Sequence, residues 1–413
     1  MNSPSDSPAA PKRFFDGSHR SCDPAETIDR VEPLFARCGI TRIANLTGLD
    51  RLQIPVVAVY RPNARSIAVS QGKGLTLDAA KASGVMEAIE VWHAEQGALP
   101  LRRATARDKR DRFAICDLDG LPQAAGFRGD EHGTPRLWAE GHNLLDNMPL
   151  WCPLEIVDAD YTRSGDDADS SFLRSTNGLA SGNHWLEAVC HGIGELVERD
   201  ATSVWRARAR RTGRLDGRID PSSVDDADCR HLLSRYATAG IDVAIWELSS
   251  DVGLAAFFVL IMDQPDATDL LPARPANGKG CHSNKAIALS RALTEAAQTR
   301  LTYISGARDD LSETDYEAAS QQENTRQCRA LIDRWPDERR QDFSRVCHHD
   351  SDDFSDDLER MLRGLKGIGI NQVIAIDLAP DTPEVDVVRV VIPGLEGPDE
   401  HPAYLPGSRA GNA

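Results

Sequence analysis

One pattern occurs three times in this chain and restricts the folds that it can adopt. Each time, a glycine-rich segment leads into a stretch with helical periodicity. The segments are SQGKGLT, STNGLASGN and NGKGCHSN, at residues 70–76, 175–183 and 277–284. The spacing is 108 residues from Glu87 to Glu195 and 100 residues from Glu195 to Glu295, too long for a solenoid repeat. The pattern therefore indicates one local unit that is used three times.

Each of the three helices gathers its polar residues on one face. At about 100° per residue, Glu187, Glu195 and Glu198 fall within roughly 80° of arc, and the apolar residues lie on another side. The corresponding sets are Ser83, Glu87 and Glu90 in the first helix and Arg291, Glu295 and Gln298 in the third. The faces of three amphipathic helices turned to solvent would explain any one of these sets.

A second interpretation is that the three polar faces meet. Carboxylates about 4 Å apart repel by roughly 4 kcal/mol per pair at an effective dielectric constant near 20, so bound cations would be needed. Mg²⁺ prefers oxygen ligands and often joins carboxylates to phosphates. If the glycine-rich segments are loops at helix N-termini, their backbone N–H groups would bind phosphate. Under this interpretation the pattern predicts a nucleotide site with Mg²⁺, in which Lys73, Lys279, Arg199 and Arg291 neutralise phosphate charge.

Familiar nucleotide-binding motifs are missing from the sequence. Neither Gly72-Lys73-Gly74 nor Gly278-Lys279-Gly280 has the spacing of a P-loop, and no Gly-x-Gly-x-x-Gly opens a βαβ unit. Cys190, Cys281, His191 and His282 lie beside the repeated motifs. Buried structural thiols and structural histidines are the more common cases for such residues, so we assign them no role in the chemistry.

The remaining periodicity predicts a mixed α/β fold. Runs rich in β-branched residues predict strands at 54–60, 66–70, 242–248, 254–262, 371–377 and 385–392. Helical periodicity is clearest at 78–95, 184–210 and 284–305. Residues 1–30 and the last dozen contain little to bury and are expected to be loose ends outside the fold. The polar stretches 164–171 and 350–357 are expected to be surface loops.

Charge and composition exclude several classes of function. The chain carries 47 basic and 64 acidic residues, a net charge of −17, which disfavours binding to a phosphate backbone. Its nine cysteines form no Cys-x-x-Cys pair and are expected to be reduced thiols. The apolar run 254–262 is too short to span a bilayer, and the N-terminus lacks the apolar core of a secretory signal. We therefore expect a soluble, cytoplasmic protein that binds neither nucleic acid nor membranes.

Three blocks of this sequence resemble the ATP-site blocks of the YcaO family. They are SQGKGLTLDAAKASGVMEAIE, NGLASGNHWLEAVCHGIGELVERDA and ALSRALTEAAQTR, and NLTGLDRLQIPV and VVRVVIPGLE resemble flanking stretches of that family. The resemblance implies a YcaO fold, with mixed sheets flanked by helices and an ATP site lined by three glutamate-bearing helices. It implies one domain at residues 31–400 between flexible tails at 1–30 and 401–413.

The resemblance also implies roles for individual residues. Ligands of the metal ions or the nucleotide would be Glu87, Glu90, Glu187, Glu195, Glu198 and Glu295. Contacts to the nucleotide would come from Asn183, Arg199, Arg291 and Gln298, while Lys73 and Ser83 lie in matching motifs. Arg42, just before the NLTGLD stretch, is a weaker candidate for binding phosphate. The cofactors implied are ATP and Mg²⁺.

Members of the family use ATP to activate a backbone amide, so the resemblance implies a similar reaction on a ribosomally synthesised peptide or a protein. The chain ends in YLPGSRAGNA without a Pro-x-Pro-x-Pro tail and has no recognisable fused N-terminal domain. This pattern resembles stand-alone members that work with a TfuA-type or leader-binding partner, and it slightly favours a thioamide over an azoline product. The alternatives are an accessory factor for methylthiolation of a ribosomal protein and a non-catalytic docking protein. The family likeness is also compatible with a homodimer.

Overall fold

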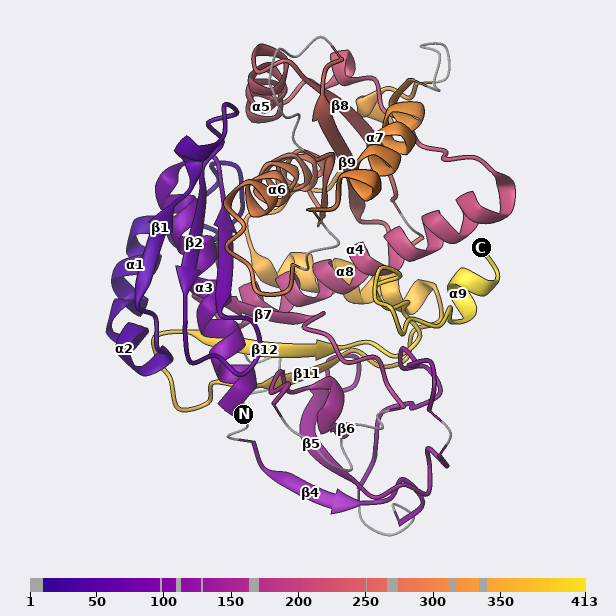
Figure 1. Cartoon of the computed structure of the whole chain (residues 1–413). Coiled ribbons are helices and arrows are strands. Elements are labelled where there is room, and N and C mark those ends of the chain that lie inside the picture. Colours follow the sequence, from indigo (N-terminus) through magenta and orange to yellow (C-terminus); the bar gives the residue numbers. More distant parts are fainter. Residues whose placement is uncertain are drawn as a thin grey trace.

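A computed structural model describes residues 10–96, 99–108, 113–127, 129–162, 171–249, 251–265, 274–311, 316–333 and 340–413 of the chain (Figure 1). The strands are β1 (Arg42–Asn45), β2 (Val56–Tyr60), β3 (Val69–Lys73), β4 (Leu101–Ala104), β5 (Arg136–Asn143), β6 (Met148–Pro153), β7 (Leu179–Gly182), β8 (Ile241–Glu247), β9 (Ala255–Asp263), β10 (Ala276–His282), β11 (Ile374–Asp377) and β12 (Asp386–Val391). The helices are α1 (Pro24–Val31), α2 (Phe35–Cys38), α3 (Leu77–Gln96), α4 (Trp185–Thr212), α5 (Ala227–Thr238), α6 (Lys285–Ser305), α7 (Ala318–Asp333), α8 (Phe354–Gly367) and α9 (Ser408–Gly411).

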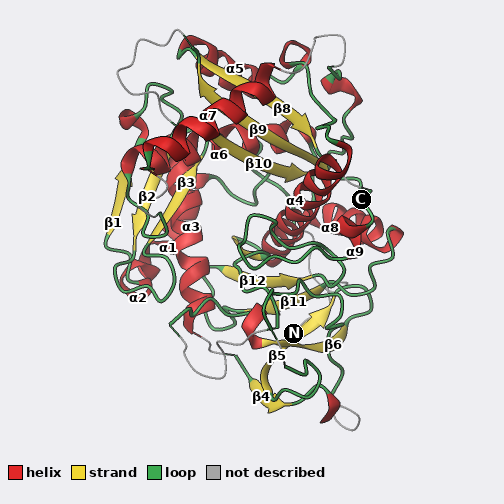
Figure 2. Cartoon of the chain, turned by 45° about the vertical axis from the view of Figure 1, so that its right-hand side comes forward, coloured by secondary structure: helices red, strands yellow, loops and turns green. Residues whose placement is uncertain are grey.

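The strands form three antiparallel sheets. Two sheets have three strands each, in the orders β1-β2-β3 and β10-β9-β8, and the third has the order β4-β5-β11-β12-β7 with β6 paired to β5. Figure 2 shows the first sheet on the left, the second at the top and the third at the bottom of the molecule. The mixed α/β fold predicted from the sequence is thereby confirmed.

Each sheet contributes one edge strand that runs directly into a long helix. These three strand–helix units are β3–α3, β7–α4 and β10–α6, and they coincide with the threefold pattern in the sequence. The helices begin and end within two residues of the ranges predicted from periodicity. The sequence therefore located the repeated unit correctly.

The glycine-rich segments themselves were predicted incorrectly as loops. They contain the edge strands β3, β7 and β10, and the predicted strand at 66–70 accordingly begins at Val69 and continues to Lys73. Glycine is needed there because each helix packs very close to its strand. A Cβ atom at Gly72 would lie 2.0 Å from the carbonyl oxygen of Ala80, and one at Gly278 would lie 2.2 Å from that of Ala292. Helix packing therefore requires these two glycines.

The two ends of the described chain also differ from the expectation of loose tails. Asp23 caps α1, which begins with Pro24, and Lys12 is buried against α8 with 5% of its surface exposed. At the C-terminal end, Arg409 forms an ion pair of 2.8 Å with the fully buried Asp200 of α4. Both ends are held because charged groups in them neutralise buried carboxylates of the main body.

The stretch 350–357, which was expected to be a surface loop, instead includes the start of α8. Within 350–357, Asp353 caps α8 through its side chain, and Asp357 lies on the first turn of α8 with only 2% exposure. Most of the other stretch, 164–171, falls outside the described residues. All nine cysteines are free thiols, as predicted. Within the described ranges, no helix combines the length and the apolar character that crossing a membrane requires.

Candidate functional site

One pocket lies where the three strand–helix units meet the N-terminal segment. Its wall is formed by residues of α3, β7–α4 and α6, together with residues between 16 and 27. Six of the residues predicted for the site line this pocket: Lys73, Ser83, Glu90, Asn183, Glu187 and Arg291. Segments more than 200 residues apart in the sequence thus contribute to one cavity.

On the α3 side, two buried carboxylates influence each other's pKa. Glu90 accepts hydrogen bonds from the backbone N–H and the hydroxyl of Ser181, at 2.9 and 2.6 Å. Burial raises the pKa of Glu90 to about 8, and the charges of Glu87 and Glu195 act in the same direction. Burial likewise raises the pKa of Glu87 to about 7, although Arg308 and Lys73 oppose it. On this side of the site, the effect of burial on the pKa values outweighs that of the nearby cations.

On the α6 side, the carboxylate is already neutralised. Lys73 at the end of β3 donates to Glu295 at 2.6 Å, and the backbone N–H of Lys279 donates to its other oxygen at 3.2 Å. Burial alone would raise the pKa of Glu295, but Lys73, Arg199 and Lys279 lower it to about 2. The contact also ties the first strand–helix unit to the third.

The carboxylates of α4 connect these two sides. Arg199 lies 3.6 Å from Glu195 and 3.7 Å from Glu198, and Glu195 also accepts a hydrogen bond from the backbone N–H of Gly178. Burial raises the pKa of Glu198, with Arg199 opposing the shift and Glu295 adding to it. Glu198 therefore interacts with the α6 side, whereas Glu195 also affects the pKa values of Glu87 and Glu90.

Glu187, in the first turn of α4, is bound by the N-terminal segment. Arg20 donates to one of its oxygens at 3.2 Å, and the backbone N–H and hydroxyl of Ser21 donate to the other at 3.1 and 2.6 Å. The nearby Asn183 donates to the hydroxyl of Thr27 at 2.9 Å. Sequence reasoning missed Arg20, Ser21 and Thr27 because it treated residues 1–30 as a loose tail. The Asp-Pro-x-Glu start signal at 23–26 could have revealed the helix that places Thr27.

The remaining candidates occupy different positions around the pocket. Arg291 donates to Nε2 of His191 at 3.2 Å, and Gln298 donates to the backbone carbonyl of Gln71 at 2.8 Å. Arg42 does not join them: it is exposed on β1, and its guanidinium stacks over the ring of Tyr60. Cys190 and Cys281 are buried, and burial raises the pKa of both thiols well above the ordinary value, which makes them poor nucleophiles.

This arrangement fits Mg²⁺ and a phosphate-bearing ligand. Carboxylate oxygens are the ligands that Mg²⁺ prefers, and burial raises the pKa of Glu87 and Glu90, so a bound cation would favour their ionised form. Among the described residues, four buried polar atoms at the site have no hydrogen-bond partner: Oδ1 of Asn183, Nδ1 of His191, Nε of Arg199 and Nε of Arg291. Such atoms carry a desolvation cost that a bound ligand would offset.

The six glutamates do not form one compact cluster. Glu87, Glu90 and Glu195 influence one another, Glu198 interacts with Glu295, and Glu187 is held separately by the N-terminal segment. The sequence predicted a single convergence of carboxylates. In the structure, Glu90 and Glu187 line the pocket, while Glu195 and Glu198 lie beside Arg199 and Glu295 is paired with Lys73. Glu87 does not line the pocket.

Comparison of the sequence with known proteins agrees with this geometry. A family model described as YcaO cyclodehydratase, ATP- and Mg²⁺-binding, matches residues 71–396. A protein encoded in the tfuA 3′ region of Rhizobium leguminosarum bv. trifolii is 35% identical over 91% of this chain and 88% of its own length. A protein of Methanothermobacter thermautotrophicus is 34% identical over 90% of this chain and 94% of its own length.

Solved structures support the same fold. YcaO from Methanopyrus kandleri, bound with AMPPCP and Mg²⁺, aligns with a TM-score of 0.72 over 94% of this chain and 95% of that protein, at 22% identity. A heterocyclase in complex with substrate and cofactor aligns with a TM-score of 0.77 over 95% of this chain, also at 22% identity. The chain spans about half the length of that heterocyclase, 54%. The chain belongs to the YcaO family of ATP- and Mg²⁺-binding cyclodehydratases.

Proposed function

We propose that this protein uses ATP and Mg²⁺ to convert a backbone amide of a ribosomally synthesised peptide or a protein into a thioamide. The observation that carries the proposal is the pocket in which carboxylates and cations of three strand–helix units meet. Membership of a family of ATP-dependent cyclodehydratases supports amide activation. An azoline, formed when a neighbouring side chain attacks the same carbonyl, is the alternative product.

The residues around the pocket divide into two groups in this proposal. The metal ligands are the six glutamates, Glu87, Glu90, Glu187, Glu195, Glu198 and Glu295. The nucleotide is bound by Lys73, Ser83, Asn183, Arg199, Arg291 and Gln298. The unpartnered atoms of Asn183, Arg199 and Arg291 support this division, because they offer one acceptor and two charged donors to a ligand.

The chemistry requires a better leaving group than an amide oxygen. A sulfur nucleophile adds to the carbonyl carbon, and the resulting oxyanion takes the terminal phosphoryl group from ATP, leaving ADP. Cleavage of the carbon–oxygen bond then releases phosphate, and loss of a proton leaves the thioamide. Lys73, Arg199 and Arg291 hold the phosphates in place, and positioning of this kind contributes much of the rate in phosphoryl transfer. Bound Mg²⁺ would supply charge stabilisation at the phosphate oxygens.

A TfuA-type protein is the partner that we propose. The relative from Rhizobium leguminosarum is named for its position in the tfuA 3′ region, and it matches this chain over nearly its whole length. Such a partner would bind the substrate or deliver the sulfur.

The proposal can be tested by co-expressing this chain with a TfuA-type protein and candidate substrates, followed by mass spectrometry. Exchange of one oxygen for sulfur in the substrate would establish the thioamide, and loss of one water would establish the azoline. A heavy-oxygen label in the substrate amide adds a second readout, because the proposed route transfers that oxygen to the released phosphate. If phosphate is released without the label, the amide oxygen is not phosphorylated and the proposal is wrong.

A further inference from the structure

Residues 10–22 form a strap that crosses the molecule before α1 begins. At its start, the strap lies along the segment that precedes α8: the N–H of Lys12 donates to the carbonyl of Asp352 at 2.9 Å, and the N–H of Phe354 donates to that of Ala10 at 3.1 Å. The strap then doubles back, since Phe14 and Arg20 pair as an isolated antiparallel bridge. It leads into α1 at Asp23, the residue that caps this helix.

The middle of the strap forms one wall of the nucleotide pocket. Asp16, Gly17, Ser18, Arg20 and Cys22 line the same cavity as Lys73 and Glu90. The strap packs tightly onto the turn before α3, because a Cβ atom at Gly17 would lie 2.2 Å from Cδ1 of Leu75. Its far end holds both oxygens of Glu187. A ligand in the pocket would therefore lie against the strap.

One buried lysine fastens the strap to α8. The ammonium group of Lys12 lies 2.7 Å from Oδ2 of Asp357, and neither side chain has more than 2% exposure. The same ammonium donates to the carbonyl and hydroxyl oxygens of Ser351, at 2.9 and 3.0 Å, and to Nδ1 of His19 at 3.1 Å. Lys12 thus joins two points of the strap, residues 12 and 19, to a single carboxylate.

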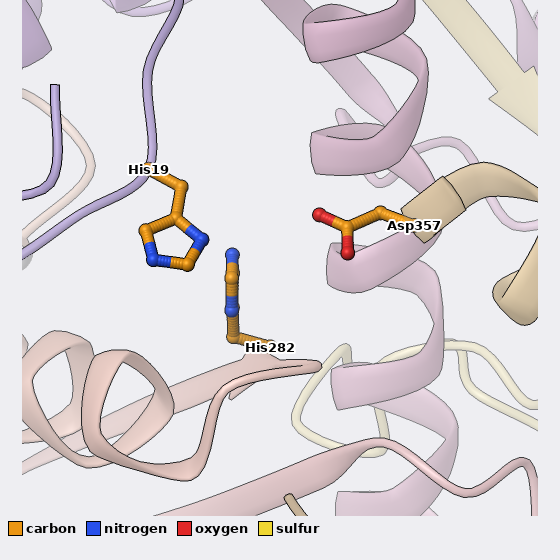
Figure 3. Close-up of side chains that lie close together, drawn as sticks. All are labelled: His19, His282 and Asp357. Carbon is orange, nitrogen blue, oxygen red and sulfur yellow. The ribbon is translucent and has the colours of Figure 1, made fainter. Parts of the chain in front are cut away.

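The group around this ion pair resembles a metal site, but its chemistry argues against one. His19, His282 and Asp357 face one another, and one ligand atom from each lies within 4.8 Å of the others (Figure 3). However, the ammonium of Lys12 already contacts both His19 and Asp357 and supplies the positive charge there. In addition, Nδ1 of His282 accepts a hydrogen bond from the N–H of Asn284 at 2.9 Å. The neutral ring then carries its hydrogen on Nε2 and cannot bind a metal through that atom.

We propose that the strap is a lid over the nucleotide pocket and that the ion pair between Lys12 and Asp357 is its latch. The lid loosens to let a nucleotide enter or leave, and the latch restores the closed state. A cation bound to Glu187 would compete with Arg20 and Ser21 for the same carboxylate, so the position of the strap is linked to loading of the pocket. This inference rests on the proposed nucleotide site.

The test compares the wild type with three variants in two measurements. Hydrogen exchange reports the opening of backbone amides in residues 13–22, and stopped-flow fluorescence reports the release of mant-ATP in the presence of Mg²⁺. Lys12→Met removes the cation of the latch. Asp357→Asn removes the charge but keeps the shape of the side chain, and it covers the case in which Lys12→Met fails to fold. Lys366→Met, an exposed lysine on α8, is the matched control.

We expect amide exchange in the strap to rise by about tenfold or more in both latch variants, because removing one partner of a buried pair is strongly destabilising. Release of mant-ATP should accelerate by a similar factor, while Lys366→Met behaves like the wild type. If folded latch variants release mant-ATP at the wild-type rate, the lid proposal is wrong, but the assignment of the nucleotide site is unaffected. If mant-ATP does not bind the wild type, the assignment of the nucleotide site is wrong, and the lid proposal that depends on it is wrong as well.

Discussion

The α3 side and the α6 side of the pocket are built from the same kind of strand–helix unit, yet they differ in charge balance. Glu87 and Glu90 on α3 have pKa values raised to about 7 and about 8, whereas Glu295 on α6 has a pKa lowered to about 2. The difference comes from the cations around Glu295: Lys73 is paired with it, and Arg199 and Lys279 lower its pKa further. Repetition of a local unit therefore does not repeat its electrostatics.

Because of this difference, the two sides of the site depend differently on a bound cation. The α6 side is balanced by lysine and arginine before any ligand arrives, and it can hold its shape in the empty protein. On the α3 side, burial favours the protonated carboxyls, and a bound cation would favour their ionised form. The carboxylates of α4 lie between the two sides and interact with both.

The largest expected effect comes from removing the two carboxylates of α4 that interact with the α3 side and the α6 side. Changing Glu195 and Glu198 together to glutamine should lower the affinity for Mg²⁺ and AMPPCP by about 100-fold or more, because two ligand carboxylates are lost. Calorimetry would measure the affinity, and far-UV circular dichroism should remain native-like. Glu359→Gln, on the exposed face of α8, is the control. Unchanged affinity in the double variant would show that α4 does not hold the metal.

A smaller effect is expected when the neutralising cation of the α6 side is removed. Lys73→Met takes away the partner of Glu295 and one of the proposed phosphate contacts, so affinity for AMPPCP with Mg²⁺ should fall by roughly 10-fold to 100-fold, the range for hydrogen bonds to charged groups. Lys81→Met is the matched control, because Lys81 pairs with the exposed Asp78 on the same helix. Equal affinities in the two variants would remove Lys73 from the site.

The smallest effect concerns the α3 side in the absence of Mg²⁺. The pKa of Glu90 is about 8 in the folded protein and 4.5 ordinarily, so between these values the folded state holds an extra proton and the free energy of unfolding falls as pH rises. Glu90→Gln should therefore raise the melting temperature of the Mg²⁺-free protein by roughly 1–3 °C at pH values above 8, and by less near pH 6. Calorimetric melting at both pH values would measure this difference. If the Glu90→Gln variant is no more stable than the wild type at high pH, the charge of the Glu90 carboxylate is already neutralised by other groups.

Much of the fold could be predicted from the sequence because it depends on local periodicity. The boundaries of α3, α4 and α6 follow from apolar residues at helical spacing, and the mixed α/β class follows from their alternation with β-branched runs. These features depend on residues that are close together in the chain.

The errors have a different physical origin. Gly72 and Gly278 were interpreted as parts of phosphate-binding loops, although the close approach of a helix to its own edge strand is what excludes a Cβ atom there. Residues 10–30 contain few apolar side chains and were therefore expected to be loose. Lys12, Arg20 and Ser21 hold them in place through buried carboxylates that lie more than 160 residues away.

The sequence by itself determined that three helices carry acids on one face. In a helix, the number of residues between two side chains fixes the angle between them around the helix axis. Only the tertiary structure decided which of those acids are paired with cations, which are not, and where the N-terminal strap lies. Charge–charge energies depend on distance and burial in space, and neither quantity is encoded in the order of neighbouring residues.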